Sequence, residues 1–471
     1  MRLALERGSF VGGPSVRSAR GERSQAIVTK RIVVLSDGTG QSVGRDDSNV
    51  LRLCRMLDHS AESRQLAIYD PGIGTHVDAK RLRVELPEVR LADPNPRRSA
   101  LRRLRRPLEL GFGLGTAENI RQLYRALIDV YEPGDEIFLF GFSRGAFTVR
   151  ALAGVIFRCG VLHRASVAQS DRVLSFCQRH YTGLGSARAD YRAQVDAFRR
   201  EHSRPCNIRF LGIWDTVKSV GYLRPKNLPH TRHNPIVEHV RHALSIDERR
   251  SFYLHTTWGG LCGEERPAVY APASFDLDLT DCPQGKPQDV KEVWFAGNHS
   301  DVGGGYPEPE SSAATISLRW MMIEAQACGL QFDESRSKAI LNLQESITQR
   351  HDEMRDRLAR RILWTIAEYT PRKELQNEPP PPMTHWKYKP AGPRRIAASL
   401  RRMADGSEAV CVHRSACRVY PTVPPPWLID LREDQIRIVP DDSSGAEDAS
   451  SPGDEEEVPL ADNAYKGPHV S

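Results

Sequence analysis

The sequence has no apolar run long enough to cross a membrane. All of its apolar stretches fall well short of the roughly 18 residues that a spanning helix requires. Residues 1–30 carry arginine and glycine without the apolar core of a secretory signal, and Glu6 and Glu22 argue against a mitochondrial presequence. We therefore expect a soluble, cytoplasmic protein, although these observations leave export by a specialised secretion system open.

Cysteines at the spacing of a metal or redox site are also missing. The nine cysteines are an odd number, and they include no C-x-x-C pair and no cysteine/histidine cluster at zinc spacing. This pattern indicates free thiols in a reducing compartment. We expect neither a metal nor an organic cofactor.

The net charge is small, but the charged residues are unevenly distributed along the chain. The formal net charge is only +6 over 471 residues, yet nine arginines fall between Asp78 and Leu110 and the chain from residue 441 onward is acidic. The arginines lack interleaved aromatic residues and a known binding motif, so we expect no nucleic-acid partner. Their simplest interpretation is a solvated loop, and the alternative is a lid or a contact with a membrane surface.

Short apolar segments alternate with segments of helical periodicity, which is typical of an α/β fold with a mostly parallel sheet and helices on both faces. Strands are expected at 31–36, 136–140, 208–214 and 292–296, and helices at 49–57, 116–130, 146–158 and 313–327.

The pentapeptide Gly141-Phe142-Ser143-Arg144-Gly145 joins a predicted strand to a predicted helix. The pattern G-x-S-x-G is weak alone, because it occurs by chance in long chains. In a strand, turn and helix context it is typical of an α/β-hydrolase, where Gly141 and Gly145 let the backbone turn without clashes. Ser143 is therefore the candidate nucleophile, and the alternative is a structural turn with an idle serine.

A serine nucleophile needs a base, and the base needs a carboxylate to orient it. His299 follows a predicted strand in a glycine-rich loop, and Asp215 ends another predicted strand. The chain order Ser143, Asp215, His299 is that of α/β-hydrolases. The alternative interpretation of Asp215 is a turn or helix-capping residue. Asp301 and Asp247 are the next candidates for the carboxylate that orients the histidine.

Main-chain amides should stabilise the oxyanion of such a reaction. One expected donor is the N–H of Arg144, at the start of the helix. The other is the backbone of Gly38 or Thr39, in the glycine-rich turn after the first strand. Asp37, in the same turn, either braces it or takes part in the chemistry.

Five motifs, in their order along the chain, are similar to those of one known family. They are Ser36-Asp37-Gly38-Thr39, Tyr69-Asp70-Pro71-Gly72-Ile73-Gly74-Thr75, Gly141-Phe142-Ser143-Arg144-Gly145-Ala146, Gly212-Ile213-Trp214-Asp215-Thr216-Val217 and His299-Ser300-Asp301-Val302-Gly303-Gly304-Gly305-Tyr306. The set resembles the α/β-hydrolase domain called domain of unknown function 2235, whose better understood members are phospholipase effectors of bacterial type VI secretion. The resemblance covers roughly Arg31 to Leu330.

The resemblance implies a Ser-Asp-His esterase domain, with the triad on Ser143, Asp215 and His299, and a phospholipid-like substrate. Two features depart from the family: the arginine-rich insert is longer than expected, and no extended membrane-docking carboxy-terminal domain follows. We expect a serine hydrolase that cleaves a lipid or phospholipid acyl ester, and the alternative is a non-catalytic binding or scaffold module. The oligomeric state is not indicated.

The domain organisation follows from these assignments. We expect a disordered segment over 1–30, an α/β-hydrolase domain over 31–435 and an acidic disordered tail over 436–471. Within the domain, a core over 31–330 holds the insert at 78–110, and an extension follows at 331–435.

Overall fold

The structure is a computed structural model. It describes residues 29–38, 47–72, 84–92, 114–181, 189–217, 231, 233–250, 253, 255–258, 269–274, 285–307, 310–341, 351, 372–375, 384–387, 401–402, 408–419 and 433–440.

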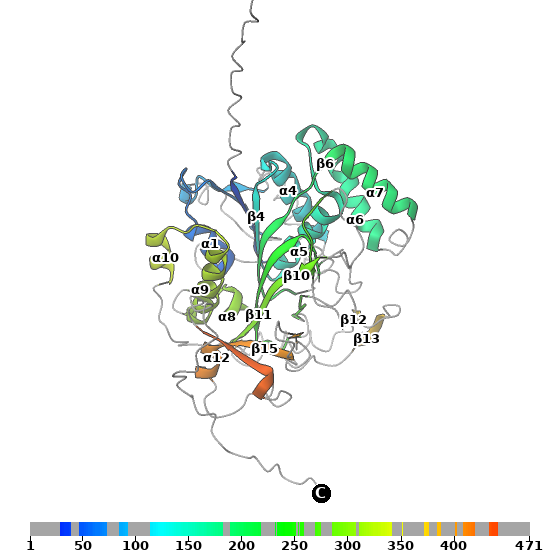
Figure 1. The fold of residues 1–471 in the computed structure, drawn as a ribbon. Coiled ribbons are helices and arrows are strands. Elements are labelled where there is room, and N and C mark those ends of the chain that lie inside the picture. Colours follow the sequence, from blue (N-terminus) through cyan, green and yellow to red (C-terminus); the bar gives the residue numbers. More distant parts are fainter. Residues whose placement is uncertain are drawn as a thin grey trace, which may run out of the picture.

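A ten-stranded sheet forms the centre of the molecule (Figure 1). Its strands are β1 (Arg31–Ser36), β2 (Gln65–Asp70), β3 (Arg90–Leu91), β4 (Glu136–Phe142), β7 (Ile208–Trp214), β8 (Val237–Ser245), β11 (Asp289–Phe295), β14 (Arg401–Arg402), β15 (Glu408–His413) and β16 (Ile436–Val439). The order is β14-β15-β11-β8-β7-β4-β1-β2-β3, with β16 beside β15. Only the β14–β15 pair is antiparallel among these strands. The predicted mostly parallel sheet is therefore confirmed.

The winding of the sheet reverses between β1 and β4. From β1 the chain passes to β2 on one side, and it then crosses to β4 and continues through β7, β8 and β11 on the other. In open parallel sheets such a reversal leaves a crevice at the carboxyl ends of the two strands, where ligands bind. Gly38 and Ser143 follow the ends of β1 and β4, so the topology brings both turns to this crevice.

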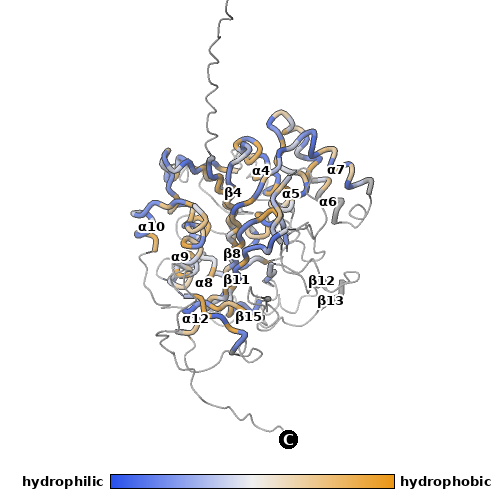
Figure 2. Tube along the Cα trace, viewed as in Figure 1, coloured by the Kyte–Doolittle hydropathy of each residue, from blue (hydrophilic) through white to orange (hydrophobic). Residues whose placement is uncertain are grey.

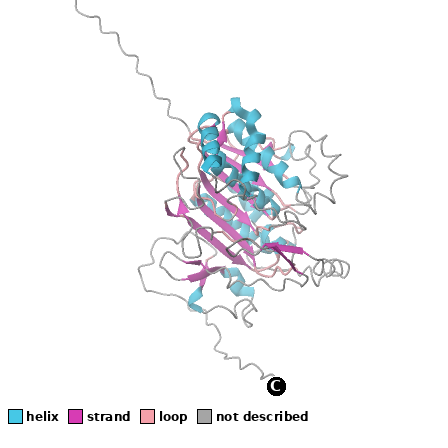
Figure 3. Cartoon of the chain, turned by 90° about the vertical axis from the view of Figure 1, so that its right-hand side faces the viewer, coloured by secondary structure: helices cyan, strands magenta, loops and turns pink. Residues whose placement is uncertain are grey.

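Helices cover both faces of the sheet (Figures 1 and 3). One face carries α1 (Asn49–Met56), α8 (His299–Gly303), α9 (Ser312–Ala327) and α10 (Glu334–Leu341), and the other carries α4 (Leu114–Val130), α5 (Arg144–Cys159), α6 (Ser170–Tyr181) and α7 (Ala189–His202). Apolar side chains of the sheet pack against each helix layer as a separate core cluster. Apolar colouring accordingly gathers along the sheet and the inner sides of the helices (Figure 2).

The remaining elements are short. They are η1 (Arg164–Gln169), β5 (Val161–Leu162) with β6 (Ser203–Arg204), β9 (Val269–Tyr270) with β10 (Lys286–Pro287), β12 (Arg372–Leu375) with β13 (Thr384–Lys387), α12 (Arg414–Val419) and η5 (Glu433–Gln435).

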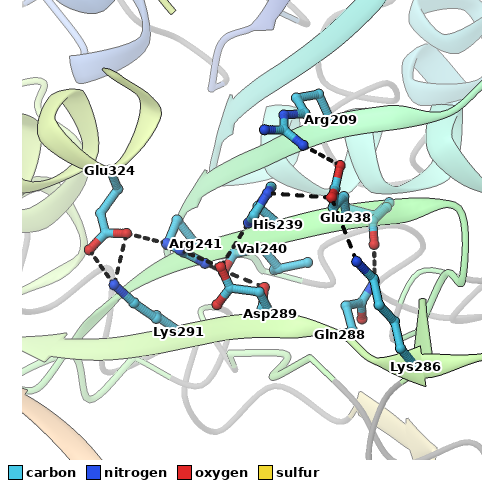
Figure 4. A network of polar contacts seen from close by, with 11 residues as sticks. Arg209, Glu238, His239, Val240, Arg241, Lys286, Gln288, Asp289, Lys291 and Glu324 are labelled. Atoms are coloured by element: carbon cyan, nitrogen blue, oxygen red, sulfur yellow. Dashed lines mark hydrogen bonds and ion pairs between the residues drawn. The ribbon is translucent and has the colours of Figure 1, made fainter. Parts of the chain in front are cut away.

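A charged network fastens α9 to the amino-terminal parts of β8 and β11 (Figure 4). Arg241 Nη2 donates to Asp289 Oδ2 at 2.8 Å, and its Nε donates to Glu324. His239 Nδ1 lies 2.7 Å from the same Asp289 oxygen, and Lys291 Nζ lies 2.9 Å from Glu324 Oε1. The hydrogen bond with Asp289 is the main reason that the pKa of His239 is raised to about 9. This network belongs to the strand ends opposite the crevice.

Two expectations from the sequence, the insert at 78–110 and the start of the tail at 436, agree with the described residues only in part. The arginine-rich insert is described at 84–92 alone, where β3 extends the sheet beside β2, and the rest of 78–110 lies outside the described residues. β16 pairs in parallel with β15, so residues 436–439 are a sheet strand and not the beginning of the tail. The expected boundary at 436 is too early because Ile436 and Val439 pack against the apolar clusters of the sheet.

No helix in the described ranges is both long and apolar enough to cross a bilayer. The same ranges hold no cluster of three histidine, cysteine or carboxylate side chains that could bind a metal ion.

Candidate active site

Ser143 occupies a strained turn between β4 and α5. Its backbone has φ 57° and ψ −119°, and a positive φ is costly for any residue with a Cβ atom. The Ser143 N–H donates to the carbonyl oxygen of Trp214 at 3.0 Å, which ties the turn to the end of β7. The serine is 7% exposed. A strained backbone of this kind at a strand-to-helix turn is typical of functional sites.

Two glycines allow the turn to be this tight. A Cβ atom on Gly141 would lie 2.6 Å from the carbonyl oxygen of Gly145, and one on Gly145 would overlap with the carbonyl group of Ser36. Both obstacles are backbone atoms, which cannot move aside as a flexible side chain can. A side chain at either position would therefore clash with the backbone of the turn, and Gly145 brings α5 into contact with β1.

Asp215 follows β7 at the position that corresponds to Ser143 after β4, because Phe142 and Trp214 are register partners. Its backbone also has a positive φ, of 38°. The carboxylate is fully buried, and it accepts hydrogen bonds from Ser245 N at 3.2 Å and Ser245 Oγ at 3.0 Å. Ser245, the last residue of β8, thus fixes the orientation of Asp215.

His299 contacts Asp215 directly. The distance between His299 Nδ1 and Asp215 Oδ2 is 2.6 Å. An ionised carboxylate can only accept, so the proton of this bond belongs on Nδ1 and the lone pair of a neutral imidazole is left on Nε2. The dyad has the tautomer that a general base for a serine requires.

The surroundings of His299 favour its neutral form. Burial lowers the pKa of His299 and outweighs the opposing hydrogen bond and charge of Asp215 and the charge of Glu248. The rings of Phe142 and Tyr253 each lie with their centroids 4.6 Å from that of the imidazole. The two aromatic rings shield the imidazole from water, and Phe142 is the residue directly before Ser143 in the chain.

A buried ion pair supports the backbone of the histidine. Glu248 Oε2 accepts from the His299 N–H at 3.3 Å, and the carboxylate also binds Arg250 at 2.8 Å and 2.6 Å. The Arg250 guanidinium covers the ring of Tyr253 at 4.0 Å. These three residues follow β8, and Glu248 and Tyr253 contact His299 directly.

A second histidine and carboxylate pair lies buried behind Asp215. His242 Nδ1 is 2.8 Å from Glu292 Oε1, and His242 Nε2 accepts from the N–H of Thr216 at 3.3 Å. Glu292 also accepts from the Trp258 N–H at 2.7 Å. His242 Nε2 already accepts a hydrogen bond from the backbone next to Asp215, so its lone pair is not available to take a proton from a substrate or a serine. His242 therefore stabilises this strand end.

The turn after β1 departs from one expectation. The Gly38 N–H donates to Asp37 Oδ1 at 2.7 Å, so this amide is engaged and does not face an oxyanion as predicted. The acceptor is the side-chain carboxylate of the preceding residue. Asp37 also accepts from Ser48 Oγ at 2.6 Å and Tyr69 Oη at 2.8 Å, and burial raises its pKa to about 6. Asp37 thus braces the turn.

The same turn nonetheless lies against the serine. A Cβ atom on Gly38 would lie 3.5 Å from the Cβ of Ser143. Thr39, the other predicted donor, lies outside the described residues. Arg144 is the first residue of α5, where a backbone N–H has no partner within the helix.

Asp301 supports the turn that carries His299. Asn298 caps α8 by accepting from the N–H of Ser300 at 2.9 Å and that of Asp301 at 3.1 Å, and Asp301 Oδ2 accepts in return from the Asn298 N–H at 3.0 Å. This reciprocal cap makes His299 the first residue of the helix. Asp301 therefore supports the turn, and Asp215 is the carboxylate that contacts His299 Nδ1.

The structure places Ser143, Asp215 and His299 after the carboxyl ends of β4, β7 and β11. Asp215 and His299 are hydrogen bonded, whereas the Ser143 hydroxyl forms no hydrogen bond to His299 within the described part of the chain. The segment Ala243-Leu244-Ser245-Ile246-Asp247-Glu248-Arg249-Arg250 also resembles the family in sequence, but sequence reasoning gave no role to Ser245 or Glu248. It did not predict the aromatic rings beside His299. The signal was the run of polar residues at the end of a central strand.

The sequence matches the family described as T6SS, phospholipase effector Tle1-like, catalytic domain, over residues 30–324. It is also similar to the uncharacterized protein YEL023C of Saccharomyces cerevisiae, with 27% identity over 405 residues that cover 64% of this chain and 58% of the yeast protein. The chain thus spans less than two thirds of the length of this relative.

Two solved structures are similar over much of the chain. An uncharacterized protein from Pseudomonas aeruginosa has 20% identity and a TM-score of 0.35, with 69% of this chain and 50% of that chain covered. The Tle1 effector, solved bound to the VgrG spike of the type 6 secretion system, has 14% identity and a TM-score of 0.32, with 72% of this chain and 79% of that chain covered.

Proposed function

Because the chain belongs to the family of Tle1-like phospholipase effector catalytic domains, we propose that it is a serine hydrolase of lipid acyl esters that works by a Ser143, Asp215 and His299 triad. The observation that carries the proposal is the 2.6 Å contact between His299 Nδ1 and Asp215 Oδ2, next to a serine on a strained turn. The family match supports the lipid substrate, and the geometry supports the serine mechanism.

The proposed reaction has two halves. His299 Nε2 takes the Ser143 hydroxyl proton as Oγ attacks the acyl carbonyl, and the same proton passes to the leaving alcohol when the ester bond breaks. A water molecule, deprotonated by His299, then attacks the carbonyl carbon of the acyl-enzyme, and His299 returns the proton to Ser143 Oγ as the acid leaves. Asp215 keeps the imidazole oriented and stabilises its positive charge during each half. The Arg144 N–H stabilises the oxyanion from the start of α5, and Thr39 is the second proposed donor.

The substrate is proposed to be a lipid that the enzyme meets at a membrane surface. The arginines of the insert at 78–110 would attract anionic headgroups, each contributing on the order of 1 kcal/mol near a charged surface. Peripheral contact of this kind needs no spanning helix.

Labelling with a fluorophosphonate probe tests the proposed nucleophile. We expect the full chain to be labelled, and labelling to disappear in Ser143→Ala and to fall strongly in His299→Ala, because the probe reacts only with an activated serine. Acyl-ester hydrolysis, measured with short esters and with phospholipid vesicles, should disappear in the same variants.

Two matched variants make the labelling experiment specific. Ser170→Ala removes a buried serine of α6, and His239→Asn removes a histidine paired with a carboxylate at the opposite strand ends. Both should be labelled like the parent protein. A folded parent protein that takes no label would contradict the triad and favour the binding or scaffold module.

The acid side of the pH profile should reflect His299. Its folded-state pKa is lowered below the usual 6.5 by burial, so the imidazole stays neutral to a lower pH than an exposed histidine. We expect kcat/KM for a soluble ester to fall only below about pH 6.5, as His299 takes up a proton and can no longer act as base. A profile that already falls between pH 7 and 8 would show that another group is the base.

A further inference from the structure

His351 contacts the turn that carries the proposed base. It lies beyond the matched family region, which ends at residue 324, and 52 residues after His299 in the chain (351 − 299). Its N–H donates to Asp301 Oδ2 at 3.0 Å, and its carbonyl oxygen accepts from Asn298 Nδ2 at 3.0 Å. Both partners belong to the cap that makes His299 the first residue of α8. The backbone of His351 therefore binds both residues that form this cap.

The imidazole of His351 adds two further contacts. Nδ1 lies 2.7 Å from Asp301 Oδ1, and Nε2 lies 3.1 Å from Glu310 Oε2. The ring stacks on Tyr306 at 3.7 Å between centroids, and the Tyr306 hydroxyl accepts from Asn298 at 2.9 Å. Every polar atom of His351 thus binds the loop between β11 and α9.

The two ring contacts require a protonated imidazole. Each carboxylate can only accept, so Nδ1 and Nε2 can both donate only when both carry hydrogen. In the neutral ring one nitrogen presents a lone pair to a carboxylate oxygen, and that contact becomes repulsive. Within the described residues, the charged groups that face the ring are Asp301, from α8, and Glu310, from the segment before α9.

We infer that His351 is a positioning residue for the proposed catalytic base: its imidazolium holds the Asn298–Asp301 cap, and thereby His299, in the orientation that Asp215 requires. This inference rests on the proposed function. It assigns to the segment after the matched family region a direct part in the site, and it makes that part depend on pH.

The direction of the pH dependence follows from the carboxylates. Hydrogen bonds and charges from Asp301 and Glu310 raise the pKa of His351 above 6.5, despite the opposing effect of burial. A raised folded-state pKa means that the contact is fully present below the unfolded pKa and is lost as pH rises through the folded one. Loss of the contact should therefore appear as an alkaline decline in activity, on the side opposite the acid decline of His299.

The test measures kcat and KM for a short soluble acyl ester from pH 5 to 10, in the full chain. The variants are His351→Asn, Glu310→Ala and the control His239→Asn, which removes an equally close histidine and aspartate pair at the opposite strand ends. Asparagine can donate to Asp301 but does not titrate. Fluorophosphonate labelling of the parent protein at pH 7 is measured first, so that failure of the proposed function is recognised separately.

We expect His351→Asn to lower kcat at pH 7 by roughly tenfold with little change in KM, because the base is misplaced while the substrate still binds. The alkaline decline of the parent protein should be absent in His351→Asn and should move to lower pH in Glu310→Ala, where one stabilising carboxylate is gone. His239→Asn should keep the parent profile. A labelled parent protein whose alkaline decline is unchanged in His351→Asn would overturn the inference. So would a loss in His351→Asn that is equal at every pH and matched by a loss of folded protein.

Discussion

The Asp215→Asn variant is expected to lose about 10⁴-fold in kcat while it stays folded and retains substrate binding. The carboxylate accepts from His299 Nδ1 at 2.6 Å and from Ser245, and it carries the negative charge that stabilises the imidazolium. An asparagine keeps the shape but removes the charge, and its amide group can donate to the imidazole and favour the wrong tautomer. Steady-state hydrolysis of a soluble ester, together with circular dichroism as a check of folding, measures the effect.

Asp247→Asn is the matched comparison. Asp247 also follows β8 and accepts from the Gly297 N–H at 2.7 Å, two residues before His299, but its carboxylate binds backbone and not the imidazole. Its replacement should cost far less in kcat than that of Asp215. A larger effect at Asp247 would mean that the orienting carboxylate has been assigned to the wrong residue.

The Gly145→Ala variant is expected to destabilise the fold by about 3 kcal/mol or more, at the upper end of the range for overpacked sites. The new methyl group would overlap with the carbonyl group of Ser36, on the central strand β1, so α5 could make room only by moving away from the sheet. Urea unfolding by linear extrapolation measures the change in the free energy of unfolding.

Gly329→Ala separates crowding from backbone strain. Gly329 has φ +102°, but the nearest atom to an added Cβ is 3.9 Å away, on the Arg31 side chain. This variant should pay only for the unfavourable dihedral, about 1–2 kcal/mol. If both variants cost the same, contact with Ser36 is not what restricts residue 145 to glycine.

The sequence predicted the apolar strands and the turns that follow them, because both signals are local. β1 and β7 lie where their continuous apolar runs indicated, and Ser143 has the strained backbone that its glycine neighbours implied. Asp215 and His299 were chosen by their places after strands, and they are in contact because parallel strands bring their carboxyl ends to one edge.

The central strand β8 was missed for a physical reason. Its sequence, VEHVRHALS, includes His239, Arg241 and His242, whereas a buried strand normally reads as an apolar run. These side chains are compatible with the interior because Asp289, Glu324 and Glu292 bind them, and in these three pairs the partners lie 50 to 83 residues apart in the chain. A local sequence pattern cannot indicate a partner that lies so far away along the chain.

The engaged amide of Gly38 and the contacts of His351 escaped prediction in the same way. Whether the Gly38 N–H is free depends on the rotamer of Asp37, which Ser48 and Tyr69 select. His351 stands in a segment without any catalytic motif, and only the folded chain shows that it meets Asp301.

The strained backbones of Ser143 and Asp215 have a consequence for how this chain can evolve. Each positive φ costs on the order of 1–3 kcal/mol, which the buried core must offset. Glycine at either position would relieve that cost and remove a side chain on which the proposed chemistry depends. Selection for stability alone would therefore erode this site first, and a homologue that has lost its activity should show the loss as glycine at these two strand ends.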